Sequence, residues 1–237
     1  MAASISVIIP AYNEEAIIYN AVRVAYDILV KAGADFEIIV VNDGSKDRTA
    51  EILNASFTNH ANISIHHKQN GGFGSAIRTG VKLATKQFIF CVPVDSPLTP
   101  SLYDAFSSNL HKADVLVSYR RQKVGYSVRK HINSWVYHWL ISVVFNMNLR
   151  DYNWIHLYNR KIFDEGKIEI EYEGIFMLAE ILIKAKRARF TFYEFEVEQT
   201  ERLTGIATAS KWSAIIKTIG EIIDFRFRNN KHPTLRN

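Results

Sequence analysis

Two apolar stretches near the N-terminus each end in a polar turn: Ile5–Glu15 (ISVIIPAYNEE) and Phe36–Ser45 (FEIIVVNDGS). Short runs of β-branched residues bounded by turn residues are typical of buried strands. In an open α/β sheet, ligands bind beyond the carboxyl ends of the strands. The two turns therefore place Tyr12, Glu14 and Asp43 at the edge of one crevice. An aromatic face and two carboxylates at that position suit a nucleoside.

Beyond these turns, the first half of the chain alternates helix and strand patterns. Apolar residues recur every three or four positions in the helical segments, whereas the strand segments are short and largely apolar. Such alternation predicts an α/β fold with a mainly parallel, doubly wound sheet. The expected helices are residues 15–32, 75–85, 102–110 and one that begins at Ser45, and the further expected strands are 63–65, 87–92 and 114–118.

The second half of the chain is more helical. Residues 131–149 carry apolar side chains at helical spacing, which fits a helix facing the core. Trp135 and Trp139, with the preceding basic pair, also fit a helix lying in a membrane interface. The basic stretch 120–130 is typical of a solvated loop or of a phosphate contact. The remaining expected elements are a segment at 154–163, helices 175–185 and 211–225 (facing the core or a partner), a strand 190–197 and a polar tail 229–237.

Composition narrows the classes of function. The chain has 237 residues, of which 48% are hydrophobic, so we expect a single domain over residues 1–228, with a nucleotide-binding half (1–118) and an acceptor half (119–228). The net charge of +5 favours anionic partners such as sugar nucleotides, lipid phosphates or a membrane surface, and no nucleic-acid motif is present. With no signal peptide, no apolar run long enough to span a membrane and a single, apolar-flanked Cys91, we expect a cytoplasmic protein, with peripheral contact to the membrane face as an open alternative.

The two opening turns carry a family resemblance. Residues 6–15 and 41–49 closely resemble the N-terminal signature of family 2 glycosyltransferases, which have the GT-A fold, a Rossmann-like half joined to an acceptor half. Residues 70–80 (NGGFGSAIRTG) look like the glycine-rich segment of that family. Three further stretches resemble the branch that contains the dolichyl- and polyprenyl-phosphate sugar synthases: Val117–Arg120 (VSYR), Leu149–Tyr152 (LRDY) and, loosely, Arg202–Gly205 (RLTG).

The resemblance implies roles for individual residues. Tyr12 and Asp43 would contact the base and Glu14 the ribose side. Asp95 would hold the metal ion, whereas Arg120 and Arg202 would meet the acceptor or the diphosphate. The full candidate set is Pro10, Tyr12, Glu14, Asp43 and Gly44 for the nucleotide, Arg78, Arg120, Arg129 and Arg202 for the diphosphate or acceptor, Asp95 for the metal and Asp151 for catalysis.

The expected cofactor is Mg²⁺ or Mn²⁺, which would neutralise the leaving diphosphate. The metal motif of the family is usually Asp-x-Asp, whereas this chain has Pro93-Val94-Asp95. Asp95 alone can hold such an ion through the diphosphate, because Mg²⁺ needs few protein ligands. The loss of the first acid leaves a non-catalytic nucleotide-sugar-binding subunit as an alternative.

The acceptor side departs from the branch as well, with Trp154-Ile155-His156 in place of Ser-Gly-Phe and with Phe73 in the glycine-rich segment. Asp151 could act as the base that removes a proton from an acceptor hydroxyl, although a phosphate acceptor would need no base. The expected function is inverting transfer of a sugar from a UDP-, GDP- or dTDP-sugar to a glycan or lipid-phosphate acceptor, in surface glycan or glycolipid synthesis. A polyprenyl-phosphate glycosyltransferase acting peripherally at the membrane is an alternative. Histidines 66, 67 and 156 are expected to be structural.

Overall fold

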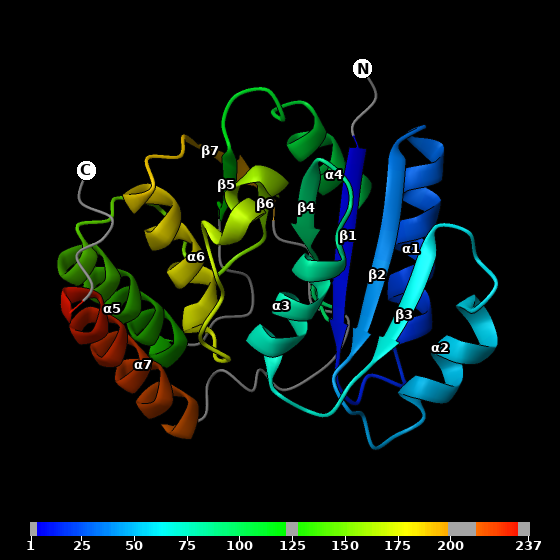
Figure 1. The fold of residues 1–237 in the computed structure, drawn as a ribbon, viewed down its shortest axis with the longest axis horizontal. Coiled ribbons are helices and arrows are strands. Elements are labelled where there is room, and N and C mark those ends of the chain that lie inside the picture. Colours follow the sequence, from blue (N-terminus) through cyan, green and yellow to red (C-terminus); the bar gives the residue numbers. More distant parts are fainter. Residues whose placement is uncertain (1–3, 122–127, 199–211, 232–237) are drawn as a thin grey trace.

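One seven-stranded sheet forms the centre of the computed structural model, which describes residues 4–121, 128–198 and 212–231 (Figure 1). The strands lie in the order β3-β2-β1-β4-β6-β5-β7, and β6 alone among them runs antiparallel to its neighbours. The strands are β1 (Ser4–Ala11), β2 (Asp35–Asn42), β3 (Ile63–His67), β4 (Phe88–Cys91), β5 (Val115–Arg120), β6 (His156–Asn159) and β7 (Phe192–Val197). The helices are α1 (Ile18–Lys31), α2 (Thr49–Phe57), α3 (Phe73–Leu83), α4 (Pro100–Ser107), α5 (Val128–Phe145), α6 (Phe176–Arg187) and α7 (Trp212–Lys231).

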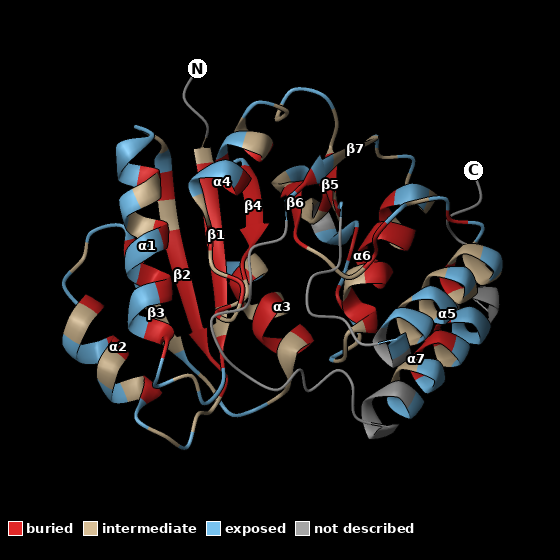
Figure 2. Ribbon diagram, turned by 180° about the vertical axis from the view of Figure 1, so that it is seen from behind, coloured by how far each residue is buried: buried red, intermediate tan, exposed pale blue. Residues whose placement is uncertain are grey.

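The expected α/β architecture with a mainly parallel, doubly wound sheet is confirmed. Helices α1, α2 and α4 cover one face, where they pack on alternate strand residues such as Val7 and Val40. Helices α3, α5, α6 and α7 cover the other face, where they pack on residues such as Ile8 and Ile39. The central strands are buried from both sides (Figure 2), which explains their almost continuous apolar sequence. Cys91 lies in this core, and burial raises the pKa of its thiol to about 12.

The strand order reverses beside β1. After β1 the chain builds β2 and β3 on one side, and it then returns to place β4 on the other side of β1. The loops that follow β1 and β4 therefore leave in different directions, and ligands bind at such a switch point in open α/β sheets. The loops after β2, β1 and β4 share this edge of the sheet (Figure 1).

Several element boundaries differ from the sequence expectation by two to four residues or more; the helix expected to begin at Ser45, for example, begins at Thr49. Two of the differences have a clear physical reason. Helix α5 ends at Phe145 rather than at residue 149, because Asn146 adopts a left-handed conformation with φ of 52°. Helix α7 continues to Lys231, so part of the expected polar tail 229–237 is helical. Propensity alone does not mark this end, because the helix is held by packing of its inner face.

The apolar face expected to fix the helix 131–149 in the core lies in solvent. Ile132, Trp135, Val136, Trp139 and Val143 are all exposed. The buried side of α5 is formed by Ile141, with Tyr137, Leu140 and Phe145 partly buried around it. The helix is thus apolar on two sides, so its spacing does not reveal which side faces the sheet. Among the described residues, no helix is long and apolar enough to cross a membrane.

Replacement of Gly80 by alanine tests the packing of α3 on β1. A Cβ atom at Gly80 would lie 2.4 Å from Cγ2 of the fully buried Ile8, so the helix must move away from the strand. We expect Gly80→Ala to lower the free energy of unfolding by about 1–3 kcal/mol, measured by urea denaturation. Gly220→Ala in α7 is the matched control, because no atom lies within 4 Å of its new Cβ. An equal effect of the two substitutions would contradict this packing.

Candidate functional site

The turns after β1 and β2 interlock through hydrogen bonds. The backbone N–H of Asn13 donates to Oγ of Ser45 (3.0 Å), and the N–H of Lys46 donates back to Oδ1 of Asn13 (2.8 Å). The N–H of Glu14 donates to Oγ1 of Thr49 (2.8 Å). The pair of turns singled out in the sequence therefore forms one rigid unit at the carboxyl edge of the sheet.

Asp43 connects this unit to the glycine-rich segment. Its buried carboxylate accepts hydrogen bonds from the backbone N–H groups of Gly71 (3.0 Å) and Gly72 (2.8 Å) and from Nζ of Lys68 (2.6 Å). Its own N–H donates to the carbonyl oxygen of Ala11 at the end of β1 (2.9 Å). Charge-assisted bonds of this kind are among the stronger ones in proteins. Asp43 thus joins the ends of β1 and β2 to residues 68–72.

Gly44 is required by this arrangement. Its φ of +72° is unfavourable for residues with a Cβ atom, and a Cβ at this position would lie 2.6 Å from the backbone nitrogen of Asn70. Beside it, Tyr12 is 44% exposed and Pro10 is partly exposed, so the ring of Tyr12 is accessible for stacking. The five residues expected to hold a nucleotide therefore gather on the loops that follow two adjacent strands.

Asp95 approaches the same edge from β4. Burial raises the pKa of Glu14, and so do the negative charges of Asp95 and Asp47. Carboxylates that follow β1 (Glu14), β2 (Asp47) and β4 (Asp95) therefore lie near one another. Asp95 lies in a turn in which the N–H of Ser96 donates to the carbonyl oxygen of Pro93 (3.1 Å). Pro93 contributes no side-chain ligand.

This arrangement fits a divalent cation whose coordination sphere is completed by oxygen atoms of a bound ligand. Within the described residues, no group of three or more His, Cys, Asp or Glu side chains is positioned to hold a metal ion. Glu14 and Asp95 nevertheless repel each other, and a cation between them and the phosphate oxygens of a donor would relieve that repulsion. Mg²⁺ is commonly held by one or two carboxylates plus phosphate and water oxygens.

A buried ion pair joins the end of β5 to the segment before β6. Nε and Nη2 of Arg120, the last residue of β5, donate to Oδ2 of Asp151 (3.0 and 2.8 Å). The guanidinium also lies 4.4 Å from the ring centroid of Trp154. Oδ1 of Asp151 accepts from the N–H of Asn153 (3.0 Å) and faces Nε2 of His138 (3.3 Å). Both side chains of the pair are almost fully buried.

These contacts favour a positioning role for Asp151 over the role of a general base expected from the sequence. Although burial alone would raise its pKa, the hydrogen bond from His138 and the charge of Arg120 hold that pKa well below its ordinary value. A carboxylate that is so acidic and already bonded removes a proton poorly at neutral pH. Its geometry instead fixes the direction of the Arg120 side chain.

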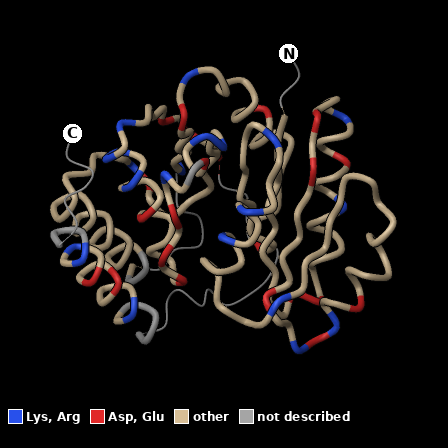
Figure 3. The backbone as a smooth tube through the Cα atoms, viewed as in Figure 1, with Lys and Arg blue, Asp and Glu red and all other residues tan. Residues whose placement is uncertain are grey.

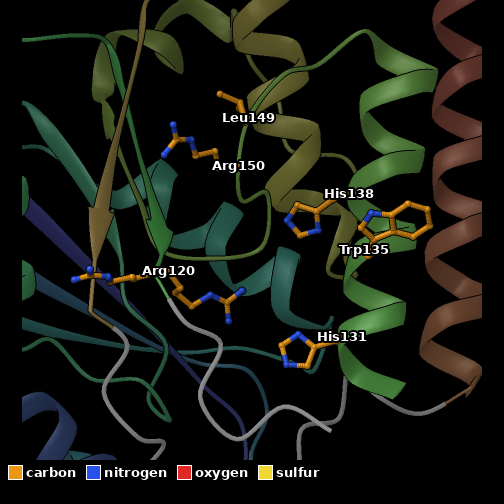
Figure 4. Close-up of a pocket in the computed structure, with 7 residues that line it drawn as sticks. Arg120, His131, Trp135, His138, Leu149 and Arg150 are labelled. Atoms are coloured by element: carbon orange, nitrogen blue, oxygen red, sulfur yellow. The ribbon is translucent and has the colours of Figure 1, made fainter. Parts of the chain in front are cut away.

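Arg120 lines a pocket of about 670 Å³ between β5 and α5 (Figure 4). The other lining residues are Arg121, His131, Trp135, His138, Leu149 and Arg150. Arg120 approaches this space from the strand, whereas His131 and His138 come from the helix, as Figure 4 shows. Arg120, Arg121 and Arg150 make the lining basic, although Arg120 is paired with Asp151 and Arg121 lies 3.6 Å from Glu196. A basic lining suits an anionic ligand such as a phosphate.

The other arginines expected at the site lie elsewhere or are not described. Nη1 of Arg78 donates to the carbonyl oxygen of Ile170 (2.8 Å), and Nη2 lies 3.9 Å from Oε1 of Glu173, so Arg78 supports the segment before α6. Arg129 belongs to α5, but its side chain is outside the described part of the structure. Arg202 lies outside the described residues.

The structure also adds residues that sequence reasoning missed. His131, Trp135 and His138 lie on one side of α5, because they are spaced four and three residues apart. Two histidines at this spacing in a largely apolar helix were a sequence signal for a polar site on that side. Arg150 directly precedes Asp151, and its Nη1 donates to the hydroxyl oxygen of Tyr119 (2.5 Å). His156 is buried, and its pKa is lowered to about 4 by burial, so it is neutral at pH 7.

Removal of the carboxylate from the buried pair should destabilise the fold. In Asp151→Asn, the guanidinium of Arg120 would stay buried without its counter-charge, which costs about 3–5 kcal/mol of unfolding free energy. Urea denaturation measures this change. Asp27→Asn is the control, because its pair with Arg23 is half exposed and contributes about 1 kcal/mol or less. Equal losses in the two variants would show that burial of the Arg120 pair is immaterial.

The same pair gives a defined pH dependence. Because the folded-state pKa of Asp151 lies below its ordinary value of 3.8, the stabilisation is fully present above that value. It is lost as the pH falls toward the folded-state pKa. The difference in unfolding free energy between the wild type and Asp151→Asn should therefore be constant from pH 7 to about pH 5 and shrink by about pH 3. A difference that grows on acidification would contradict this assignment.

Comparison with known proteins agrees with this architecture. The family model for glycosyl transferase family 2 matches residues 6–170. Glycosyltransferase YibD of Escherichia coli (strain K12) is 23% identical over 219 residues, which cover 83% of this chain and 62% of that protein. Glycosyltransferase AglD of Haloferax volcanii is 28% identical over 204 residues, which cover 82% of this chain and 32% of that protein. The chain thus spans only part of these curated relatives.

Solved structures share the fold. Mannosyl-3-phosphoglycerate synthase from Rubrobacter xylanophilus superposes with a TM-score of 0.70 at 14% identity, over 97% of this chain and 75% of that one. Glucosyl-3-phosphoglycerate synthase from Mycobacterium tuberculosis, solved with Mn²⁺, UDP and phosphoglyceric acid, gives a TM-score of 0.70 at 16% identity, over 94% of this chain and 78% of that one. The sheet is therefore of the GT-A type. Because the family model covers well over half of the sequence, this chain belongs to glycosyl transferase family 2.

Proposed function

We propose that this chain transfers a sugar from a nucleotide-diphosphate donor to an acceptor that carries an anionic group, with inversion at the anomeric carbon. The observation that carries the proposal is the meeting of Tyr12, Glu14, Asp43 and Asp95 at the ends of three adjacent parallel strands. We assign these roles to one domain over residues 1–228, in which residues 1–118 bind the donor and 119–228 the acceptor.

On the donor side, the exposed ring of Tyr12 would stack on the base, and Glu14 would face the ribose. Asp43 would form the base side of the pocket by holding residues 68–72 in place with its buried carboxylate, while Pro10 and Gly44 shape the floor of the pocket. The donor is a UDP-, GDP- or dTDP-sugar. The UDP present in the mycobacterial neighbour supports a nucleoside diphosphate as the donor class.

Asp95, with Glu14 beside it, would hold Mg²⁺ or Mn²⁺ against the diphosphate of the donor. The cation supplies positive charge to the oxygens of the diphosphate as it leaves. The chain itself holds the donor and the acceptor in line, which removes much of the entropic barrier to reaction. The neighbour solved with Mn²⁺ and UDP supports this cofactor class.

On the acceptor side, the pocket of Arg120, Arg121 and Arg150 would bind a phosphate or another anionic group. An acceptor oxygen would attack the anomeric carbon as the bond from that carbon to the diphosphate oxygen breaks. An attacking phosphate is already ionised and brings no proton, so the reaction would need no base. Asp151 would then keep Arg120 aimed at the ligand, and Arg129 and Arg202 are proposed as further contacts.

The identity of the acceptor has two candidates within this scheme. A polyprenyl phosphate presented by a membrane fits the basic pocket and the branch that residues 117–120 and 149–152 resemble. A glycan that carries acidic groups fits the same pocket without a membrane, and its attacking hydroxyl would release a proton to solvent as the glycosidic bond forms. Either acceptor would place the protein in surface glycan or glycolipid synthesis.

A second function, a nucleotide-sugar-binding subunit without turnover, is favoured by one observation. Pro93 stands where the usual metal motif has its first carboxylate. Such a subunit would bind donors with an affinity that metal ions do not raise, and it would not consume them.

Calorimetric titration distinguishes these functions. UDP, GDP and dTDP are titrated into the protein with and without Mn²⁺, and turnover is followed with the matching nucleotide sugars. We expect one nucleotide to bind at least about tenfold more tightly with Mn²⁺, and Asp95→Asn to lose that gain, because a ligand of the bridging ion is removed. Asp104→Asn on the exposed side of α4 is the control and should keep the gain.

Three results are decisive. If none of the three nucleotides binds, the proposed function is wrong. Binding that is unaffected by Mn²⁺, together with no loss of donor over hours, identifies the non-catalytic subunit instead. An Asp104→Asn variant that loses as much as Asp95→Asn would show that the effect is one of overall negative charge.

A further inference from the structure

The outer side of α5 is apolar although it faces solvent. Its exposed apolar residues are Val128, Ile132, Trp135, Val136, Trp139 and Val143. The two tryptophans are 67% and 53% exposed. A surface helix of a globular protein usually turns charged and polar residues to water. The solvent-facing side of α5 therefore lacks the composition of an ordinary surface.

Helix α7 repeats this pattern. Ile216, Ile219, Ile223 and Phe227 are exposed, and their spacing of three and four residues places them on one side of the helix. The opposite side carries the buried Ile222 and Phe225. Two helices of the same molecule thus each expose a continuous apolar stripe.

The two stripes belong to one end of the molecule. Helices α5 and α7 lie side by side, on the side of the sheet far from α1 and α2 (Figures 1 and 2). Both pack inward on α6, where the rings of Phe145 and Phe225 lie 6.2 and 5.4 Å from that of Phe176. Because the inner sides are used for this packing, both stripes point away from the core. We call the ten exposed apolar residues the α5–α7 face.

The two helices that form the α5–α7 face are basic overall, and we call their Lys and Arg residues its rim. The two helices contain six Lys or Arg residues and two acidic ones, and α5 contains no acid. The acids are not available to a partner, because Glu221 is buried and Asp224 accepts hydrogen bonds from the hydroxyl of Tyr172 (2.7 Å) and Nε of Arg228 (2.9 Å). Lys217 lies 3.9 Å from Oε1 of Glu221, and Arg228 is paired with Asp224. The six basic and two acidic residues leave the two helices with a net charge of +4. Figure 3 colours the basic positions of the described residues blue.

This charge selects the partner. A second copy of the chain would bring two cationic rims together, and like charges facing each other across an interface are unfavourable. An anionic lipid surface instead offers opposite charge at the rim and an apolar layer below it. Helices with basic residues on the flanks and Trp, Phe and Ile on one side bind in that boundary region. Tryptophan suits it because its ring is apolar and its N–H is polar.

We propose that the α5–α7 face docks this protein on an anionic membrane, with both helices lying in the plane of the surface. The apolar stripes enter the boundary between headgroups and acyl chains, and the basic rim contacts the lipid phosphates. Trp135 belongs both to this face and to the pocket of Arg120, so docking brings the pocket to the membrane surface. That consequence for a lipid-borne acceptor rests on the proposed function, whereas the docking itself does not.

Flotation of the whole chain with vesicles tests the docking. Vesicles of phosphatidylcholine alone are compared with vesicles that contain phosphatidylglycerol, at low and high salt. We expect binding to the anionic vesicles, weaker binding to the neutral ones and a decrease with salt, because the rim charges are screened. Trp139→Glu and Ile223→Glu, one on each helix, should each weaken binding to anionic vesicles by at least about tenfold, since a charge replaces buried apolar area.

Val30→Glu is the matched control. Val30 lies on α1 and is 52% exposed, the same fraction as Ile223, but it belongs to the other face of the sheet. It should bind vesicles like the wild type. Thermal unfolding of each variant shows whether it is folded. Quenching of wild-type tryptophan fluorescence by brominated anionic lipids provides a second measurement that needs no variant.

Three outcomes would overturn the docking proposal: no flotation and no quenching with anionic vesicles, an equal loss in Val30→Glu, or a stable dimer in solution that Trp139→Glu and Ile223→Glu dissociate. Donor binding is measured without vesicles, so failure of the docking leaves the donor titration untouched. Failure of the donor titration likewise leaves the flotation result intact.

Discussion

The carboxylate of Asp43 is the interaction on which the donor edge depends. Three donors from residues 68–72 meet it, and its backbone joins β2 to the end of β1. Loops carry many unsatisfied backbone groups, and one buried anion satisfies several of them here. The glycine-rich segment thereby gains a fixed position relative to Tyr12 and Glu14. A nucleoside would meet a preformed surface rather than one that it must order.

A second buried anion organises the residues around the end of β5. Asp151 accepts hydrogen bonds from the guanidinium group of Arg120, and the ring of Trp154 lies against the same guanidinium group. A buried ion pair of this kind contributes little net stability but fixes a direction. Two buried carboxylates thus support other groups from inside the protein. Asp43 supports the backbone of residues 68–72, and Asp151 supports the guanidinium group of Arg120. Ligand-facing groups such as Tyr12 and Arg150 are supported around them.

The sequence was sufficient for the donor half because its signals are local. Apolar strands, the Asn13 and Gly44 turns and the glycine-rich segment each act over a few residues, and the parallel topology follows from their order. The acceptor half depends on contacts between distant segments. The partner of Arg120 is 31 residues away, and His138 reaches the site from a helix whose apolar pattern covers both its sides. Periodicity cannot reveal which of two apolar sides is buried, so the sequence left open whether Trp135 and Trp139 face the core or lie at the surface.

Strand β6 has a geometric consequence for the whole molecule. It is the antiparallel member that separates β4, which leads to Asp95, from β5, which ends at Arg120. Neighbouring strands lie about 4.8 Å apart, so this single strand sets a gap of roughly 10 Å between the two segments. That span is comparable with one sugar ring plus a phosphate. The hydrogen-bonded width of the sheet therefore sets the distance between the strand that leads to Asp95 and the strand that ends at Arg120.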